Sequence, residues 1–167
     1  MNEVATVRAA LGLGSNLGDT KANLDQAVAT LAAIPGIRVI ARSSDYRTPP
    51  WGPVAQDDYR NACLVVETSL PAHGLLDACL ATEESMGRVR DVRWGPRLID
   101  IDVLIYGDDE IDDARLTLPH PRMWERSFVL VPLSEIWPDA PVGKGLTAER
   151  ALIDRNDRDE IILLRNV

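Results

Sequence analysis

In the stretch RWGPRLIDIDVLIYG, residues 93–107, two acids lie in the middle of a run that otherwise has the apolar pattern of a buried β-strand. Side chains in a strand point to opposite faces in turn, so Asp100 and Asp102 are expected on the same face. The opposite face is expected to be apolar and to consist of Ile99, Ile101, Val103 and Ile105. The acidic face would also carry Leu98, Leu104 and Tyr106. A fully hydrated acidic face is therefore not favoured.

The pattern elsewhere predicts three more strands and two amphipathic helices in the first ninety residues. The strands are expected at residues 6–15, 37–48 and 59–69, and the helices at residues 20–34 and 71–87. Asp19 or Thr20 can cap the first helix, and Pro35-Gly36 ends it. Four further elements are predicted after the acidic strand, namely a hairpin at 109–117, helices at 126–137 and 146–154, and a strand at 160–164.

The order strand, helix, strand, strand, helix, strand indicates the fold class. It is the βαββαβ order of ferredoxin-like α/β (α+β) folds, in which a mainly antiparallel sheet carries helices on one face. The other face would be free for a functional site. A chain of 167 residues that is 46% hydrophobic suits one domain, spanning residues 1–167, with C-terminal additions to this core.

Charge and segment composition exclude several classes of protein. The net charge of −8 argues against binding to nucleic acid or to an anionic membrane. Neither a signal peptide nor an apolar run of membrane-spanning length is found, so the expected location is the cytoplasm. Cys63 and Cys79 lie in apolar segments without a C-x-x-C partner, which indicates small core residues and not ligands or a disulfide.

The two acids of the strand need compensation. Their Cα atoms would lie about 6.6 Å apart, and two like charges about 5 Å apart repel by about 3 kcal/mol at an effective dielectric near 20. One interpretation is a solvated face or an edge strand protected by charge. The other is a divalent cation with oxygen ligands, and Mg²⁺ is the usual choice when phosphates complete the coordination. The D-x-D motif alone does not decide between them.

The Gly-rich stretch LGLGSNLGD, residues 11–19, resembles a nucleotide-binding loop only superficially. Gly18 is followed by Asp19 where the Walker motif has Lys-Ser/Thr, and Leu17 occupies a position where the dinucleotide motif needs Gly. We therefore interpret the stretch as a tight turn into the first helix.

Three other stretches carry candidate chemistry. The loop GRVRDVRWGPR offers four guanidinium groups, which bind phosphate oxygens in pairs, although an exposed loop that aids solubility would look the same. In YRTPPWGPVAQDDYRNA, Trp51, Tyr59 and Asn61 could bind a flat heterocycle, or the aromatic rings could simply pack. LTLPHPRMWERSF contains His120, a candidate phosphate neighbour, whereas His73 is interpreted as incidental.

Several blocks in collinear order resemble one family. They are GSNLGD, YRTPP, DYRNA, GRVR, RWGPRLIDIDVLIYG and LPHPRMWERSFVLVPL, and together they resemble the 6-hydroxymethyl-7,8-dihydropterin pyrophosphokinase family from about residue 11 to residue 138. The resemblance implies a monomeric enzyme of tetrahydrofolate biosynthesis that transfers the pyrophosphoryl group of ATP to the pterin hydroxymethyl group and releases AMP.

The resemblance also implies roles for individual residues. Asp100 and Asp102 would hold two Mg²⁺ ions, and with Arg88 and Arg97, which bind the transferring phosphates, they would form the catalytic set. The implied ATP-binding residues are Arg88, Arg90, Arg97, Ile99, His120, Arg126, Arg115, Thr117 and Glu83. The implied pterin-binding residues are Thr48, Pro49, Trp51, Tyr59, Asn61, Trp94, Phe128 and Asp100.

The sequence departs from the family at a few positions, and two other functions fit part of the pattern. The loop between Gly87 and Trp94 is shorter than in the family, and Leu80 and Pro121 replace a polar and an aromatic residue, which leaves adenine recognition and loop closure open. Polymerase palms and nucleotide cyclases also present paired Asp on a ferredoxin-like sheet, but a template groove does not suit this small acidic chain. A ligand-sensing module would explain the fold but not the Arg-rich loop.

Overall fold

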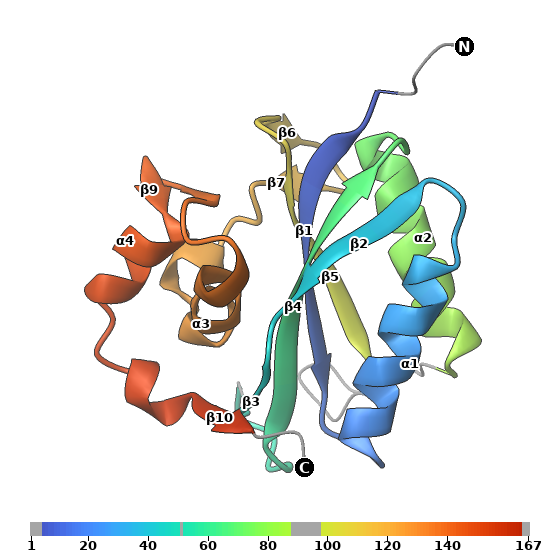
Figure 1. Cartoon of the computed structure of the whole chain (residues 1–167). Helices are drawn as coiled ribbons and strands as arrows, with labels where there is room; N and C mark the ends of the chain where they lie inside the picture. Colours follow the sequence, from blue (N-terminus) through green and yellow to red (C-terminus); the bar gives the residue numbers. More distant parts are fainter. Residues whose placement is uncertain (1–4, 51, 88–97, 165–167) are drawn as a thin grey trace.

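An antiparallel sheet of six strands forms the centre of the molecule (Figure 1). The computed structural model describes residues 5–50, 52–87 and 98–164. The strand order is β10-β3-β4-β1-β5, and β2 also pairs with β4. The strands of this sheet are β1 (Val7–Ser15), β2 (Ile37–Arg42), β3 (Asp45–Thr48), β4 (Tyr59–Thr68), β5 (Asp100–Tyr106) and β10 (Ile162–Leu164). The acidic strand β5 therefore lies beside β1, at one edge of the sheet, as its antiparallel neighbour.

Helices α1 (Thr20–Ala32) and α2 (Ala72–Ser85) pack against one face of the sheet (Figure 1). Asp19 caps α1, because its Oδ1 accepts a hydrogen bond from the Ala22 N–H at 3.1 Å. The chain turns away after α1 at Gly36, whose φ of +91° is open to glycine at little cost. The apolar side of α1 is fully buried through Leu24, Ala27 and Leu31. This arrangement confirms the ferredoxin-like α/β fold class.

The second face of the sheet is partly covered, whereas the sequence predicted it to be free. Helix α3 (Ser127–Ile136) packs on β4, and α4 (Ala148–Ile153) packs on α3. Their core includes Leu130 and Leu133 from α3 together with Cys63 and Leu104 from the sheet. The prediction was wrong here because seven of the ten residues of α3 are apolar, and such a helix does not remain exposed. Two hairpins complete the fold, β6 (Ile111–Asp112) with β7 (Thr117–Leu118) and β8 (Pro141–Gly143) with β9 (Leu146–Thr147).

The predicted strand 37–48 is divided into β2 and β3, which pair with β4 in succession. Ser43, between them, is buried, and its N–H donates to the Cys63 carbonyl at 2.9 Å while its Oγ accepts from the Cys63 N–H at 2.9 Å. The side-chain oxygen thus replaces a backbone acceptor of the ladder. The chain bends at this point without leaving the Cys63 N–H unpaired.

A β-bulge changes the faces predicted for the end of the acidic strand. Ala10 pairs with Ile105 and Leu11 pairs with Val103, so Leu104 is the extra residue. Beyond the bulge the alternation is inverted. Ile105 packs in the core beneath α3, and Tyr106 packs in the core beneath α1 and α2, where its hydroxyl donates to the Leu70 carbonyl at 2.6 Å. The predicted faces of Ile105 and Tyr106 were therefore wrong.

Cys63 and Cys79 are buried and not joined in a disulfide, as predicted. Burial raises the pKa of the Cys79 thiol to about 12, and burial also raises the pKa of Cys63. Both side chains are therefore protonated core groups at neutral pH. Among the helices that the structure describes, none has the length and apolar character needed to cross a bilayer.

Candidate active site

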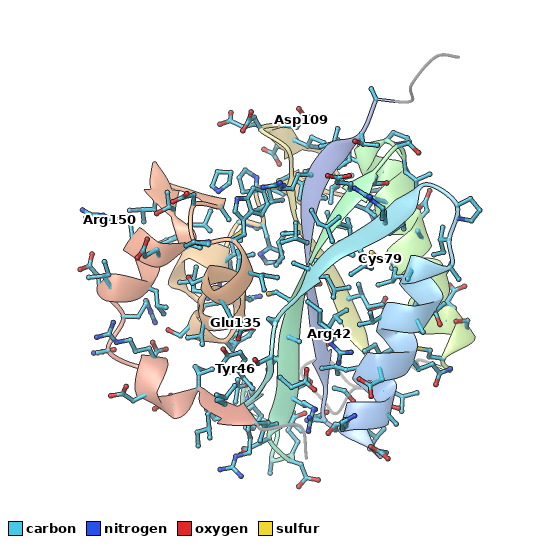
Figure 2. All side chains as sticks on the ribbon, in the orientation of Figure 1. Arg42, Tyr46, Cys79, Asp109, Glu135 and Arg150 are labelled. Carbon is cyan, nitrogen blue, oxygen red and sulfur yellow. The ribbon has the colours of Figure 1, made fainter. Side chains whose placement is uncertain are left out.

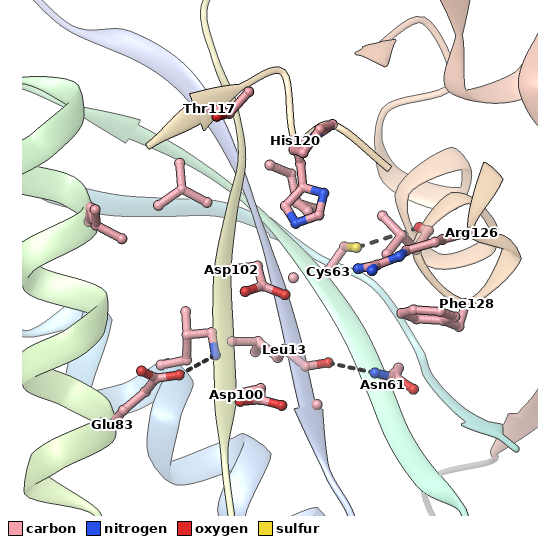
Figure 3. Close-up of a pocket in the computed structure, with 18 of the residues that line it drawn as sticks. Leu13, Asn61, Cys63, Glu83, Asp100, Asp102, Thr117, His120, Arg126 and Phe128 are labelled. Carbon is pink, nitrogen blue, oxygen red and sulfur yellow. Dashed lines mark hydrogen bonds between the residues drawn. The ribbon is translucent and has the colours of Figure 1, made fainter. Parts of the chain in front are cut away.

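A cavity of about 600 Å³ opens on the face of the sheet that α3 covers only in part. Its floor comes from β1, β4 and β5, and its walls from α2, the β6–β7 hairpin and the start of α3. Figure 3 shows Asp100 and Asp102 on β5 turned toward the space that His120, Arg126 and Phe128 border from the opposite side. The sheet thus brings together residues that lie far apart in the sequence.

Two glycines face the acid pair across the β1–β5 ladder. Gly12 pairs with Asp102, and Gly14 pairs with Asp100. Both glycines line the cavity, so the floor beside the carboxylates carries no side chains on β1. Sequence reasoning had assigned the Gly-rich stretch to a turn and missed this role. The signal was present, because G-x-G and D-x-D share the two-residue period of paired strands.

Gly14 also makes room for Asn61. A Cβ atom at position 14 would lie 2.8 Å from the Asn61 Nδ2, which is too close for a non-bonded contact. The amide is held on both sides, because Thr48 Oγ1 donates to its Oδ1 and its Nδ2 donates to the Leu13 carbonyl at 3.3 Å. Within the described residues, these bonds leave one N–H and one oxygen lone pair of the amide available to a ligand. Asn61 is thus preorganised to bind a group that both donates and accepts.

Aromatic side chains border the same end of the cavity. Tyr59 at the start of β4 and Phe128 at the start of α3 both line it, together with Pro49 after β3. The Arg126 guanidinium lies over the Phe128 ring, with Cζ 5.6 Å from the ring centroid. This end therefore offers flat apolar surfaces next to the polar edge of Asn61, a combination that suits a heterocycle.

Cationic groups border the other side of the cavity. Arg115, from the β6–β7 hairpin, and Arg126 line it together with His120. Burial, reinforced by the charges of Arg126 and Arg122, lowers the pKa of His120 to about 4. The imidazole is therefore neutral at pH 7. Arg126 provides positive charge on the side opposite the two acids (Figure 3), whereas Arg115 pairs with Asp77 of α2. Negative and positive walls that face each other suit a complex of polyphosphate with a metal ion.

Glu83, a buried side chain of α2, supports the edge strand. Only 2% of this residue is exposed, and its Oε2 accepts from the Ile101 N–H at 2.8 Å. Ile101 lies between Asp100 and Asp102, so this bond fixes the backbone that carries both acids (Figure 3). Glu83 also lines the cavity.

The structure places most of the candidate residues around this one cavity. The pterin-side candidates that line it are Thr48, Pro49, Tyr59, Asn61, Phe128 and Asp100. The candidates for ATP or metal that line it are Glu83, Asp102, Arg115, Thr117, His120 and Arg126. Ile99 does not join them, because it is fully buried in the core beneath α1 and α2. Trp51, Arg88, Arg90, Trp94 and Arg97 lie outside the described residues.

The donor set around the acid pair fits Mg²⁺. Asp100 is half-buried and Asp102 is exposed, and both border the cavity. Mg²⁺ is commonly bound by one or two carboxylates, with phosphate oxygens and water as the other ligands. Among the described residues, no group of three or more His, Cys, Asp or Glu side chains is placed to hold a metal ion. The carboxylate pair is the candidate metal site because both side chains border the cavity on one face of β5.

Comparison with known proteins agrees with this geometry. The family model for 7,8-dihydro-6-hydroxymethylpterin-pyrophosphokinase matches residues 10–138. The chain is 59% identical to the 2-amino-4-hydroxy-6-hydroxymethyldihydropteridine pyrophosphokinase of Methylorubrum extorquens over 145 residues, which are 87% of this chain and 91% of that protein. It is 43% identical to the Bacillus subtilis protein of the same name over 136 residues, 81% of this chain and 79% of the relative.

A solved structure shows the same fold at much lower identity. The wild-type HPPK-DHPS of Plasmodium falciparum, crystallised with pteroate, matches with a TM-score of 0.70 and 16% identity. The match covers 92% of this chain and 43% of the Plasmodium chain, so this protein spans less than half of that longer one. The family model and the sequence relatives establish membership, and this chain belongs to the 7,8-dihydro-6-hydroxymethylpterin-pyrophosphokinase family.

Proposed function

We propose that the cavity is the site where this chain transfers the pyrophosphoryl group of ATP to the hydroxymethyl group of 6-hydroxymethyl-7,8-dihydropterin. The products are AMP and the pterin diphosphate, a step of folate biosynthesis. One observation supports this assignment most directly. A single cavity has an acidic wall, a cationic wall and an aromatic end, where hydrogen bonds fix the amide of Asn61. Each part matches one part of the reactants, namely metal, polyphosphate and pterin.

Asp100 and Asp102 are the proposed ligands of two Mg²⁺ ions. Bound Mg²⁺ would neutralise the phosphate charge and lower the pKa of the substrate hydroxyl. The protein's own contribution is to hold both carboxylates on one face of β5, and the bond from the Ile101 N–H to Glu83 fixes the strand between them. Asp102 could accept the substrate proton, but a carboxylate that binds a metal is a weak base. Positioning and charge neutralisation are therefore the main terms.

The aromatic end is the proposed pterin site. Tyr59 and Phe128 would hold the ring between their faces, and Asn61 would bind its polar edge with the amide positions that Thr48 and Leu13 leave open. Pro49 and the backbone of Thr48 complete the pocket. Trp51 and Trp94 remain proposed contacts from the family resemblance alone.

The cationic wall is the proposed ATP site. Arg115, Thr117, His120 and Arg126 line it, and Glu83 borders it from α2. A neutral imidazole can donate a hydrogen bond to phosphate, while the two arginines neutralise charge. Arg88, Arg90 and Arg97, which lie outside the described residues, are proposed to bind the phosphates as well.

The test of this function is the nucleotide product. ATP with the reduced pterin should give AMP, and Asp100→Asn or Asp102→Asn should lower turnover by more than about 100-fold, because each removes charge from a proposed metal ligand. Glu67→Gln is a matched control, since Glu67 pairs with Arg38 on the surface and does not border the cavity. Formation of ADP would indicate an ordinary kinase. AMP release at the wild-type rate by both Asp variants would refute the metal assignment.

We propose further that the protein acts in the cytoplasm and does not bind nucleic acid. The net charge of −8 supports the second point, because non-specific binding to nucleic acid depends on positive charge.

A further inference from the structure

The C-terminal part of the chain lies beyond the family match but returns to the proposed pterin site. The match ends at residue 138, whereas the structure continues through α4 to β10. Helix α4 packs on α3, and β10 pairs with β3, with Ile162 opposite Arg47 (Figure 1). The segment thus contacts two of the three elements from which the pterin site is built, β3 near Thr48 and α3 near Phe128.

Asp157 makes the direct connection from this segment to the start of α3. Its Oδ1 accepts from Ser127 Oγ at 2.6 Å, and its carboxylate also accepts from Arg155 Nε and an Arg155 terminal nitrogen at 3.2 Å each. Ser127 is 2% exposed. Hydrogen bonds from Arg155 and Ser127 hold the pKa of Asp157 below its usual value, so the group is ionised at neutral pH.

The start of α3 has no side-chain cap from its own sequence. Arg126 occupies the N-cap position and makes no capping bond, which leaves the helix without the usual Ser, Thr, Asp or Asn contact. A carboxylate near the first turn is favourable because the helix dipole is positive at that end. Asp157 therefore supplies, from thirty residues further along the chain, an anchor that the local sequence does not provide.

The anchored residue lies between two residues of the cavity. Ser127 is preceded by Arg126 and followed by Phe128, both of which line the cavity and contact each other through the guanidinium and the ring. A change in the position of the Ser127 backbone would therefore move the Phe128 ring relative to Asn61 and Tyr59, which are fixed on β4.

We infer that Asp157 is a positioning residue for pterin binding, which acts through Ser127 to fix Phe128 against the sheet. The inference rests on the proposed function, because it takes Phe128 as a contact of the pterin. The segment after residue 138 would thus contribute to pterin binding, although Asp157 itself does not line the cavity.

The test is the affinity for 6-hydroxymethyl-7,8-dihydropterin, measured by calorimetry with the full chain, both alone and with a non-hydrolysable ATP analogue. Ser127→Ala and Asp157→Ala should each raise the dissociation constant about 3- to 10-fold, because the lost hydrogen bond acts on the pterin only indirectly, through the position of Phe128. The double variant should be no weaker than the worse single one, because both changes remove the same bond. Asp157→Asn keeps an acceptor for Ser127 and should recover most of the affinity.

Two controls separate the possible failures. Phe128→Ala tests the proposed site itself, and unchanged pterin binding in that variant would refute the pocket assignment. If Phe128→Ala weakens binding while Ser127→Ala and Asp157→Ala bind as the wild type does, even with a lower melting temperature, then Asp157 is a structural brace only and the inference is wrong. Additive losses in the double variant would also overturn it. If Asp157→Ala does not fold, Ser127→Ala and Asp157→Asn carry the test. Glu67→Gln should bind the pterin normally.

Discussion

At the scale of single residues, the role of Asp100 and Asp102 depends on the residues that face them across the sheet. The D-x-D pair is compatible with a charged edge strand or with a metal site, and β5 is in fact an edge strand of the sheet. The opposing glycines at positions 12 and 14 favour the metal site, because they line a cavity beside the carboxylates that a protective charged edge would not need. The tight fit of Gly14 against Asn61 links this space to the proposed pterin end.

The buried state of His120 predicts a loss of stability in acid. The pKa of this side chain is about 4 in the folded protein and about 6.5 when it is exposed. Between these values the unfolded chain binds a proton that the folded chain does not, so the free energy of unfolding should fall as the pH falls from about 6.5 to about 4. In His120→Gln the stability should fall less between pH 7 and pH 4.5 than in the wild type. The measurement is the melting temperature of both proteins at pH 7, 5.5 and 4.5.

His73→Gln is the control for this experiment, since His73 is the other histidine of the chain and lies on the surface beside Asp113. That variant should keep the acid loss caused by His120. An unchanged pH profile in His120→Gln would show that His120 does not remain neutral in the folded protein.

At the scale of elements, α3 and β3 both contribute to the proposed pterin site, through Phe128 and Thr48. A polar junction joins the two elements, where Glu135 of α3 accepts hydrogen bonds from the Tyr46 hydroxyl and from the Ser44 N–H (Figure 2). Tyr46 is buried, and both burial and the neighbouring Glu135 raise the pKa of its hydroxyl. The phenol therefore stays protonated and acts as a donor.

This junction predicts an energetic coupling between the two residues. Tyr46→Phe and Glu135→Ala should each destabilise the protein, and their double-mutant cycle should give an interaction free energy of about 1–3 kcal/mol, as for a hydrogen bond to a charged group. The measurement is urea unfolding of the four proteins. Glu135→Gln keeps an acceptor for the Tyr46 hydroxyl. This variant should therefore destabilise the protein less than Glu135→Ala does. A coupling near zero would mean that the apolar face of α3 alone holds the helix on the sheet.

For the whole molecule, the family resemblance implies a monomer, and this remains a prediction. We therefore expect a mass near 18.4 kDa by light scattering after size exclusion, and turnover per chain that does not change with protein concentration. A dimer mass together with activity that falls on dilution would contradict this expectation.

The sequence by itself determined most of the elements and their order. Periods of two and of three to four residues predicted β1, β4, β5, α1 and α2, because burial of one face imposes that spacing. The same reasoning predicted the hairpin and the helices that follow. It also singled out the acid pair and, through the family resemblance, ten further residues that line the cavity.

Contacts between distant segments decided the rest. The bulge at Leu104, the division at Ser43, the cover of α3 on the second face, the glycine floor beside the acids and the anchor from Asp157 to Ser127 all depend on which strands and helices meet. Local periodicity describes only how a segment alternates between inside and outside. Pairing register and the hydrogen bonds that satisfy buried backbone groups are set by neighbours remote in sequence, and so only the tertiary structure fixes them.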